Sequence, residues 1–411
     1  MRERPDLLTG DSPGGLRVFQ LTTEETPSSH IYMEAQIFTP DSRRFLLHHP
    51  ARAHGIDFRD PAHRYLVCDL DSGGELTPVI EEVGATAPSV SPDGGFLYYF
   101  VDATTPCRPG RLTLKRVRMD GTGREEIAVL DGAPAGWPGP FSRPYSLSTI
   151  SSDGARLAIS GFLGDGRSEN APWGLLVFDA ASGGVELILQ GPSWCNVHAQ
   201  YCRSTDPEAA RDILVQENHG NLCDATGRCT QLVGGEGADV HVIRDDGTGF
   251  RDLPWGRDGN ESCQGHQCWV GTSRRAITST ITREPAGREL IEGRAAPHAG
   301  HLGSRTPGGE RNDLSRGFPA PDFCHFATDI AGRRLISDSG PRDGGGGLWL
   351  GRLPGEEGGA IEDWTWLLNP RSTWRKESHI HPFLSPDGRT GFFNSDESGV
   401  HQCYMVRGWE D

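Results

Sequence analysis

The sequence lacks the features that mark several large classes of protein. Apolar residues make up 35% of the chain, and no stretch approaches the roughly 20 apolar residues that a membrane-spanning helix requires. The residues from Met1 to Asp6 lack the apolar core of a secretory signal peptide, so we expect a cytoplasmic protein with no membrane partner. A basic character is also missing, because the formal net charge is -16, and this argues against nucleic acid as a partner. An acidic small substrate remains compatible with this charge, since a local cationic or metal-bearing pocket can occur in an acidic protein.

The sparse cysteines and the absence of common catalytic signatures exclude further classes of protein. The ten cysteines do not form the dense framework of a small disulfide-bonded domain, and without an export signal we expect mostly reduced thiols. A local disulfide involving Cys223 and Cys229, with Cys195 and Cys202 nearby in the sequence, is the alternative to small buried side chains. Signatures of serine hydrolases, kinases and zinc proteases are absent. The glycine run at residues 344–347 is a loop and not a phosphate-binding turn, because no helix follows it.

Turn-forming residues are abundant, whereas long amphipathic helical patterns are scarce. The chain has 55 glycines and 29 prolines, and most of its apolar runs are short and bounded by Gly, Asp, Ser or Pro. This pattern is typical of many short strands joined by turns. A length of 411 residues favours more than one domain, unless stacked repeats share one continuous core.

A turn followed by a short apolar strand recurs along the chain. The copies are spaced by roughly 50 to 65 residues, which suits one four-stranded propeller blade with a loop. In several units a second turn with Asp-Gly or Gly-Gly follows and supplies the positive φ that tight hairpins require. The sequence therefore predicts an all-β, seven-bladed β-propeller that forms one domain over residues 1–411. The seven turns are Thr39-Pro40-Asp41, Ser91-Pro92-Asp93-Gly94, Ser152-Asp153-Gly154, Ser204-Thr205-Asp206-Pro207, Gly271-Thr272-Ser273-Arg274, Thr328-Asp329-Ile330-Ala331-Gly332 and Ser385-Pro386-Asp387-Gly388.

The two ends of the chain and one internal segment complete this prediction. Residues 17–22 form a strand with no earlier partner, and we expect this strand to pair with a late strand at residues 401–406 and so close the last blade. Residues 283–318 are rich in Gly, Arg, Pro and His, and they predict a long loop or a lid over the central site, with disorder as the alternative.

Histidines recur at one position of the repeat. The segment before each Pro-Asp-Gly turn lines the central channel of a propeller, and His266, His325 and the pair His379 and His381 occupy it in three consecutive units. Neutral imidazole is the commonest ligand of divalent first-row metals. The spacing of His379 and His381 is that of a strand, so both rings should point to one face. We therefore predict a metal site formed by His325, His379 and His381, suited to Mn, Fe, Ni or Zn, with hydrogen-bonded packing histidines as the alternative.

Neighbouring residues are candidates for the rest of the site. His266 is either a fourth ligand or a base. His198 and Gln200 are predicted to bind substrate, the alternative being residues that hydrogen-bond within the channel wall. His219, which follows an inner strand, and Trp269, beside His266, are predicted substrate contacts as well.

These histidine segments, in this order on the repeated turns, resemble the oligogalacturonate lyases, a family of cytoplasmic, manganese-dependent, pectin-degrading propellers. The resemblance extends from about Arg17 to Val406. It implies manganese as the cofactor, with His325, His379 and His381 as its ligands and His266 as the Brønsted base. The most specific segments are Glu261-Ser262-Cys263 with His266 and Trp269, Cys324-His325, His379 to Gly388, and Val197 to Cys202 with Thr205-Asp206-Pro207.

Two positions depart from the family pattern. Lys376 stands where the family has a glutamine ligand, and Asp239 stands where it has a catalytic-site arginine, for which Arg228 is an alternative because of an insertion around residues 223–237. A protonated lysine has no lone pair, so we predict that Lys376 does not ligate the metal. Lys376 or Arg203 is instead expected to hold a substrate carboxylate.

The predicted function is a metal-dependent lyase that cleaves short uronic-acid oligosaccharides by β-elimination. This reaction requires neutralisation of the carboxylate, which a divalent metal can supply, and a base such as His266 to take the α-proton. One alternative is a relative that eliminates, isomerises or hydrolyses another sugar at the same metal. A second alternative is a non-catalytic binding propeller, because the fold alone does not decide function. No oligomeric state is predicted.

Overall fold

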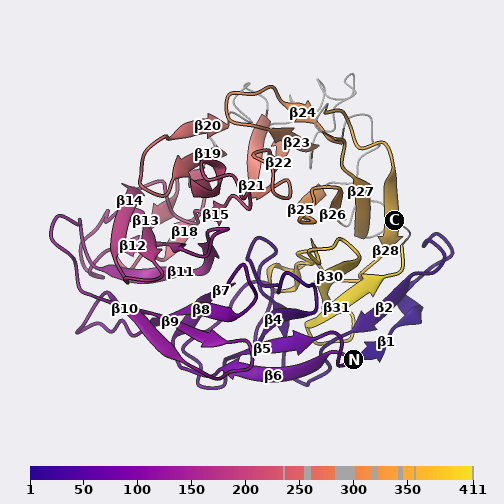
Figure 1. The fold of residues 1–411 in the computed structure, drawn as a ribbon, viewed down its shortest axis with the longest axis horizontal. Coiled ribbons are helices and arrows are strands. Elements are labelled where there is room, and N and C mark those ends of the chain that lie inside the picture. The colour runs from indigo at the N-terminus through magenta and orange to yellow at the C-terminus, as the bar shows by residue number, and fades with distance from the viewer. Residues whose placement is uncertain are drawn as a thin grey trace.

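Short antiparallel strands account for nearly all the regular structure of the computed structural model. The structure describes residues 1–234, 237–253, 261–282, 301–315, 323–340, 346–355 and 358–409. Figure 1 shows the sheets arranged around a central axis, with the two chain ends on the same side of the ring. None of the helices in this part of the chain has the length and apolar character needed to cross a membrane.

Four of the sheets contain four strands, each in simple up-and-down order or its reverse. They are β3 (Ser29–His30), β4 (Arg44–His49), β5 (Arg64–Asp69) and β6 (Glu75–Ile80); β7 (Ala85–Val90), β8 (Phe96–Asp102), β9 (Arg111–Arg118) and β10 (Glu125–Asp131); β11 (Phe141–Ile150), β12 (Arg156–Leu163), β13 (Trp173–Asp179) and β14 (Val185–Gly191); and β25 (Phe323–Thr328), β26 (Arg334–Ser339), β27 (Gly347–Arg352) and β28 (Trp364–Leu368).

A larger sheet contains β15 (Gln200–Tyr201), β16 (Asp212–Asn218), β19 (Ala238–Arg244), β20 (Arg251–Leu253), β21 (Glu261–Trp269), β22 (Ala276–Thr282), β23 (His301–Arg305) and β24 (Asn312–Asp313). Its two halves, β15-β16-β19-β20 and β21-β22-β23-β24, pair at one position, Ala238 with Cys263. A small separate hairpin follows β16 and consists of β17 (Leu222–Cys223) and β18 (Cys229–Gln231). Within the described residues, three short 3-10 helices lie between strands: η1 (Pro5–Leu7), η2 (Ala209–Arg211) and η3 (Lys376–Ser378).

The last sheet contains both ends of the chain. It joins β29 (Phe383–Leu384), β30 (Thr390–Ser395) and β31 (Gln402–Arg407) to β2 (Arg17–Gln20) and β1 (Arg2–Glu3). β2 lies within the segment predicted to close the ring and pairs with β31 from Arg17 opposite Arg407 to Gln20 opposite Tyr404. A buried apolar cluster then joins this sheet to the neighbouring one, with Val18, Phe393 and Val406 on one side and Ile336 and Leu348 on the other.

The repeated turns have a common physical basis. In the turn between β7 and β8, the Ser91 hydroxyl donates to Asp93 at 2.5 Å, and the Asp93 carboxylate accepts the Gly95 N–H at 2.9 Å. Gly94 has a φ of +71°, which a residue with a side chain rarely adopts. The same hydroxyl–carboxylate contact recurs at Ser151 with Asp153 and at Ser385 with Asp387.

The prediction of an all-β propeller is confirmed, whereas the predicted number of blades is wrong. Among the described residues the blade strands form six sheets, because the pairing of Ala238 with Cys263 joins the fourth and fifth predicted units into one sheet. The long loop predicted over residues 283–318 also needs correction. Residues 301–315 contain β23 and β24, since the outer edge of β22 offers backbone hydrogen bonds that β23 satisfies. Residues 283–300 and 316–318 lie outside the described residues.

Candidate metal centre and cavity

Five histidine rings meet near the central axis. The His325 ring centroid lies 4.4 Å from the centroids of both His266 and His381, and 5.2 Å from that of His379. The His54 centroid lies 5.0 Å from that of His379 and 4.8 Å from that of His381. The residues predicted as metal ligands and as the base are thus brought together.

His379 and His381 reach the cluster from a loop and not from a strand. They follow η3 and precede β29, which begins at Phe383. His381 has a φ of +48°, in the left-handed region that residues with side chains seldom occupy. The intervening Ile380 is buried, and its carbonyl accepts the Asn394 N–H at 2.9 Å. The strand spacing was therefore the wrong reason for the predicted pairing, although both rings do enter one cluster.

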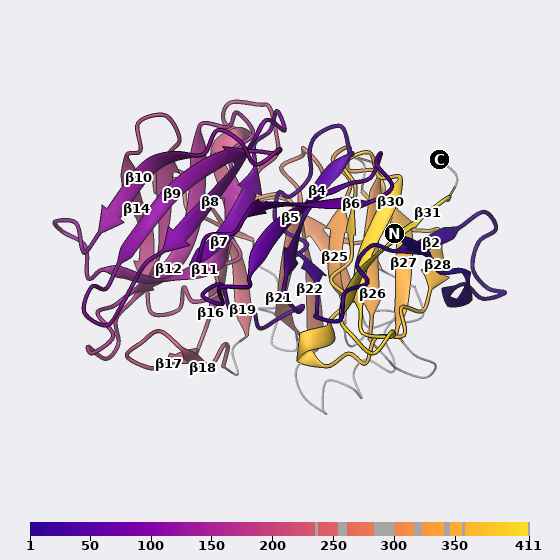
Figure 2. The ribbon, with the colours of Figure 1, turned by 90° about the horizontal axis from the view of Figure 1, so that it is seen from below.

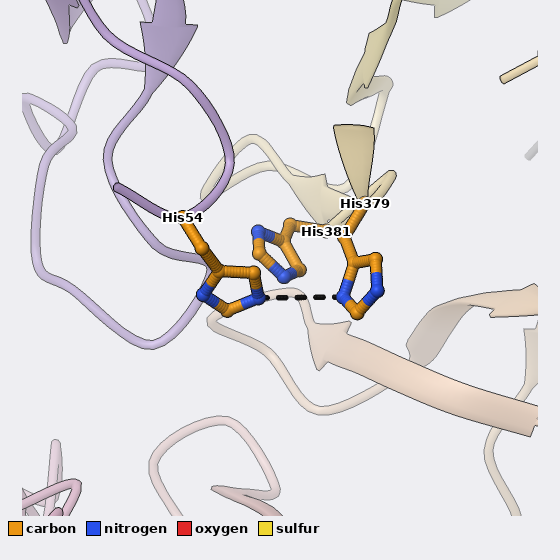
Figure 3. Close-up of side chains that lie close together, drawn as sticks. All are labelled: His54, His379 and His381. Carbon is orange, nitrogen blue, oxygen red and sulfur yellow. Dashed lines mark hydrogen bonds between the residues drawn. The ribbon is translucent and has the colours of Figure 1, made fainter. Parts of the chain in front are cut away.

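His54 was not predicted. It lies in the loop between β4 and β5, and its Nε2 is 3.3 Å from Nδ1 of His379 (Figure 3). Figure 3 shows the His54 ring arriving from the opposite side to the loop that carries His379 and His381. The sequence around His54 contains no repeat position or motif that would have marked this histidine.

The ligand atoms fall into two groups, and the predicted trio is divided between them. His54, His379 and His381 form one group, and His266, Cys324 and His325 form the other. Within each group the possible ligand atoms lie within 4.8 Å of one another. The Cys324 sulfur lies 3.8 Å from Nδ1 of His266 and 3.8 Å from Nε2 of His325.

The chemistry of these side chains fits a divalent metal. Nε2 of His381 is buried and has no hydrogen-bond partner among the described residues, which is costly unless a cation uses its lone pair. Burial, followed by the neighbouring histidines, lowers the pKa of His325 and of His381 well below the usual value. Burial together with His379 lowers the pKa of His54 to about 3. The rings are therefore neutral at neutral pH, which is the form that binds metals.

Asp338 orients His325 from behind. Its Oδ2 lies 2.8 Å from Nδ1 of His325, and its Oδ1 accepts the His325 backbone N–H at 2.8 Å. A proton on Nδ1 leaves Nε2 with its lone pair, so this carboxylate selects the tautomer that can ligate a metal. Burial raises the pKa of Asp338 to about 7, and a bound cation would favour its ionised form.

His198 belongs to a separate buried network. Its Nδ1 lies 2.7 Å from Oε2 of Glu34, and its Nε2 lies 3.1 Å from the Tyr145 hydroxyl. Burial raises the pKa of Glu34, and a φ of +51° places His198 in the left-handed region. Both ring nitrogens thus have protein partners, and Tyr145 extends this network to the cavity.

A cavity of about 550 Å³ opens beside the histidine cluster. His54, His198 and His266 line it, together with the cations Arg52, Arg143 and Lys376, which are all exposed at its wall. Two of these cations, Arg52 and Arg143, were not predicted. They come from the β4–β5 loop and from β11, and nothing in the local sequence distinguishes them from other surface arginines. Three positive charges beside a histidine cluster suit an anionic ligand.

Four residues predicted to contact substrate or to act in catalysis lie outside this cavity wall. The Gln200 amide donates to the Gln267 carbonyl at 2.8 Å, and the Trp269 indole donates to the Gln200 carbonyl at 2.9 Å, so both connect β15 to β21. Arg203 lies beyond β15, and burial lowers the pKa of its guanidinium. Nε2 of His219 lies 2.8 Å from Oδ2 of Asp239.

The two family positions that had changed can also be placed. Asp239, the residue predicted to replace the family arginine, lies in β19 and pairs with His219. Arg228 is exposed in the turn of the β17–β18 hairpin and does not line the cavity. Of the described residues, only Lys376 among the predicted cations lies at the cavity wall.

Comparison with solved structures supports the fold. An oligogalacturonate lyase in complex with manganese superposes with a TM-score of 0.70 at 19% identity, covering 100% of this chain and 97% of that protein. An oligogalacturonate lyase from Vibrio parahaemolyticus superposes with a TM-score of 0.67 at 16% identity, covering 97% of this chain and 95% of that protein. The resemblance of this chain to the oligogalacturonate lyases therefore extends over the whole propeller fold. No protein-family model matches the chain, and no curated protein matches it in sequence.

Proposed function

We propose that this protein is a metal-dependent lyase that cleaves short uronic-acid-containing oligosaccharides by β-elimination. The observation that carries the proposal is the position of the histidine cluster, at the wall of a cavity that also presents Arg52, Arg143 and Lys376. Its overall likeness to two oligogalacturonate lyases, one of them a manganese complex, supports this substrate class and Mn²⁺ as the metal.

The metal would be held by His379 and His381 with His54 on one side and His325 on the other. A divalent cation there supplies Lewis acidity to the substrate carboxylate, which makes the neighbouring proton more acidic. Lys376 and the two cavity arginines hold the remaining negative charge of the substrate. Lys376 is exposed at the wall, and an ammonium group has no lone pair, so its role is to pair with a carboxylate and not to ligate the metal.

His266 is proposed as the base. Its side chain lines the cavity, and burial, followed by the neighbouring histidines, lowers its pKa well below the usual value. The ring is therefore neutral and can accept a proton. A histidine that binds the metal through its unprotonated nitrogen cannot accept a proton. Within the group of His266, Cys324 and His325, His266 is therefore assigned as the base and His325 as the ligand.

The test uses the full chain with Mn²⁺ and a panel of uronide oligosaccharides. Elimination creates a double bond conjugated to a carboxylate, so the ultraviolet absorbance of the unsaturated product should rise. His266→Ala should lower turnover by about 10²- to 10⁴-fold while Mn²⁺ content stays the same. His219→Ala is the matched control, because His219 pairs with Asp239 outside the cavity wall and should keep wild-type turnover.

Two outcomes would contradict the proposal. If His266→Ala loses Mn²⁺ as well as turnover, His266 is a ligand and the base is another residue. If no uronide in the panel gives an unsaturated product with Mn²⁺-loaded protein, the lyase assignment fails. Consumption of another sugar without new absorbance would then favour isomerisation or hydrolysis at the same site.

A further inference from the structure

A second group of convergent ligand atoms lies away from the histidine cluster. The sulfurs of Cys195, Cys223 and Cys229 lie within 4.8 Å of one another, and those of Cys223 and Cys229 are 2.7 Å apart. Cys195 is buried in the loop between β14 and β15, whereas Cys223 and Cys229 face each other across the β17–β18 pair. Three separate segments thus contribute one sulfur each.

The β17–β18 hairpin has little apolar packing of its own. It lies apart from the blade strands, at the lower edge of the view in Figure 2. Leu222 is 58% exposed, and of the strand residues only Cys223 and Cys229 pack against the buried cluster that contains Cys195 and Trp173. A hairpin of this size is marginal in water without a further constraint.

We propose that Cys195, Cys223 and Cys229 form a thiolate site for a soft divalent metal ion, zinc in the first instance, which fixes the β17–β18 hairpin to the blade. Zinc accepts thiolate ligands in tetrahedral geometry, with water able to fill the fourth position when the protein supplies three. Binding is balanced by proton release: one Zn²⁺ and three thiols give a tris-thiolate complex of charge -1 and three protons taken up by buffer.

A metal accounts for all three converging sulfurs, whereas a Cys223–Cys229 disulfide accounts for two of them. A Cys223–Cys229 disulfide would link two strands that are already paired, so it would close a very short loop and leave the hairpin unattached to the blade. It would also leave the sulfur of Cys195 without a role. A metal uses all three sulfurs and connects the hairpin to the loop before β15.

The site has a consequence for the cavity. Asn196, next to Cys195, lines the cavity, and so do Leu232 and Val233, which follow β18 directly. The Cys195 thiol also lies 3.7 Å from the Leu232 carbonyl. A metal that holds these segments together therefore shapes one wall of the cavity, independently of which reaction takes place there.

The first test titrates reduced, chelator-stripped full-length protein with Cd²⁺ alone and follows the ultraviolet charge-transfer band of cadmium–thiolate bonds. Wild type and a Cys324→Ser variant should both show the band, because Cys324 is the thiol of the central histidine cluster and lies outside the proposed site. Cys229→Ser should lose it, and Cys107→Ser should keep it, because Cys107 is an exposed cysteine outside the group. A missing band in wild type, or an unchanged band in Cys229→Ser, would overturn the proposal, as would a Cys223–Cys229 disulfide in protein isolated from cells.

The second test needs no variant. Arg228 is exposed in the hairpin turn, so trypsin cleavage after it reports local opening. Zinc at about ten times its dissociation constant should slow this cleavage about tenfold. Equal cleavage rates in stripped and zinc-loaded wild-type protein would overturn the proposal. A failed lyase assay has no bearing on either test, because neither uses a sugar substrate.

Discussion

Replacement of Asp338 by asparagine should weaken Mn²⁺ binding without removing any residue that touches the metal. Asp338 accepts two hydrogen bonds from His325, one from the backbone N–H and one at Nδ1, each at 2.8 Å. Asparagine has nearly the same shape but only one acceptor oxygen. If that oxygen keeps the backbone N–H, the amide NH₂ faces Nδ1 and drives the ring proton to Nε2, which is the nitrogen needed for the metal.

The expected loss of Mn²⁺ affinity follows from this loss of control over the tautomer of His325. Outer hydrogen-bond partners of metal-bound histidines are worth about 10- to 100-fold in metal affinity, or about 1.4 to 2.7 kcal/mol. Calorimetric titration of stripped protein with Mn²⁺ should show this change for Asp338→Asn. Ser337→Ala is the control, because Ser337 lies in the same strand and its hydroxyl donates to the backbone carbonyls of His325 and Asp338, which leaves the His325 ring and its tautomer unaffected.

The refuting result is specific. An Mn²⁺ affinity within about twofold of wild type, combined with a lower melting temperature for Asp338→Asn, would show that the carboxylate supports only folding. An equal loss of affinity in Ser337→Ala would show that any disturbance of β26 weakens the site. Either result would remove the argument that Asp338 selects the tautomer of His325.

Three further predictions concern the site and the fold. His54→Ala should lower Mn²⁺ affinity more than Asp338→Asn does, because it removes a ligand; equal affinity to wild type in the same titration would exclude His54 as a ligand. Lys376→Met should raise KM for an active uronide about tenfold with a smaller effect on kcat, because a charge-assisted hydrogen bond to the carboxylate is lost; an unchanged KM would place the carboxylate elsewhere. Burial lowers the pKa of both His30 and His63 to about 4, below the unfolded value of about 6.5. Between pH 4 and 6.5 the unfolded chain therefore binds more protons than the folded chain does. The free energy of unfolding should fall by about 1.4 kcal/mol per group per pH unit as the pH decreases from 6.5 towards 4. Urea unfolding at pH 7 and at pH 5.5 measures this loss, and equal midpoints would contradict the burial of neutral rings.

The repeated turns made the propeller predictable from the sequence. A Ser or Thr, an Asp and a Gly at fixed offsets form a local hydrogen-bonded turn, as at Ser91, Asp93 and Gly94, whatever the rest of the chain does. The position of His325, His379 and His381 before such turns then places them near the central axis. These inferences rest on local chemistry and on the repeat, both of which a sequence contains in full.

The number of sheets depended instead on one long-range pair. Ala238 and Cys263 join two repeats, and no local pattern in either segment signals this contact. The same holds for Gln200 and Trp269, which the sequence placed near the substrate and which the tertiary structure uses to connect β15 with β21. Strand register across two segments, rather than the residue types themselves, decides such contacts.

The sequence by itself determined the fold class, the inward position of the repeated histidines and the identity of three of the clustered rings as metal-ligand candidates. Only the tertiary structure brought His54 and the cavity arginines to them from elements far away in the chain, and set Asp338 of the adjacent strand β26 behind His325. Periodicity reports which side of an element a residue faces, whereas a metal site and its supporting charges depend on distances between side chains of different elements.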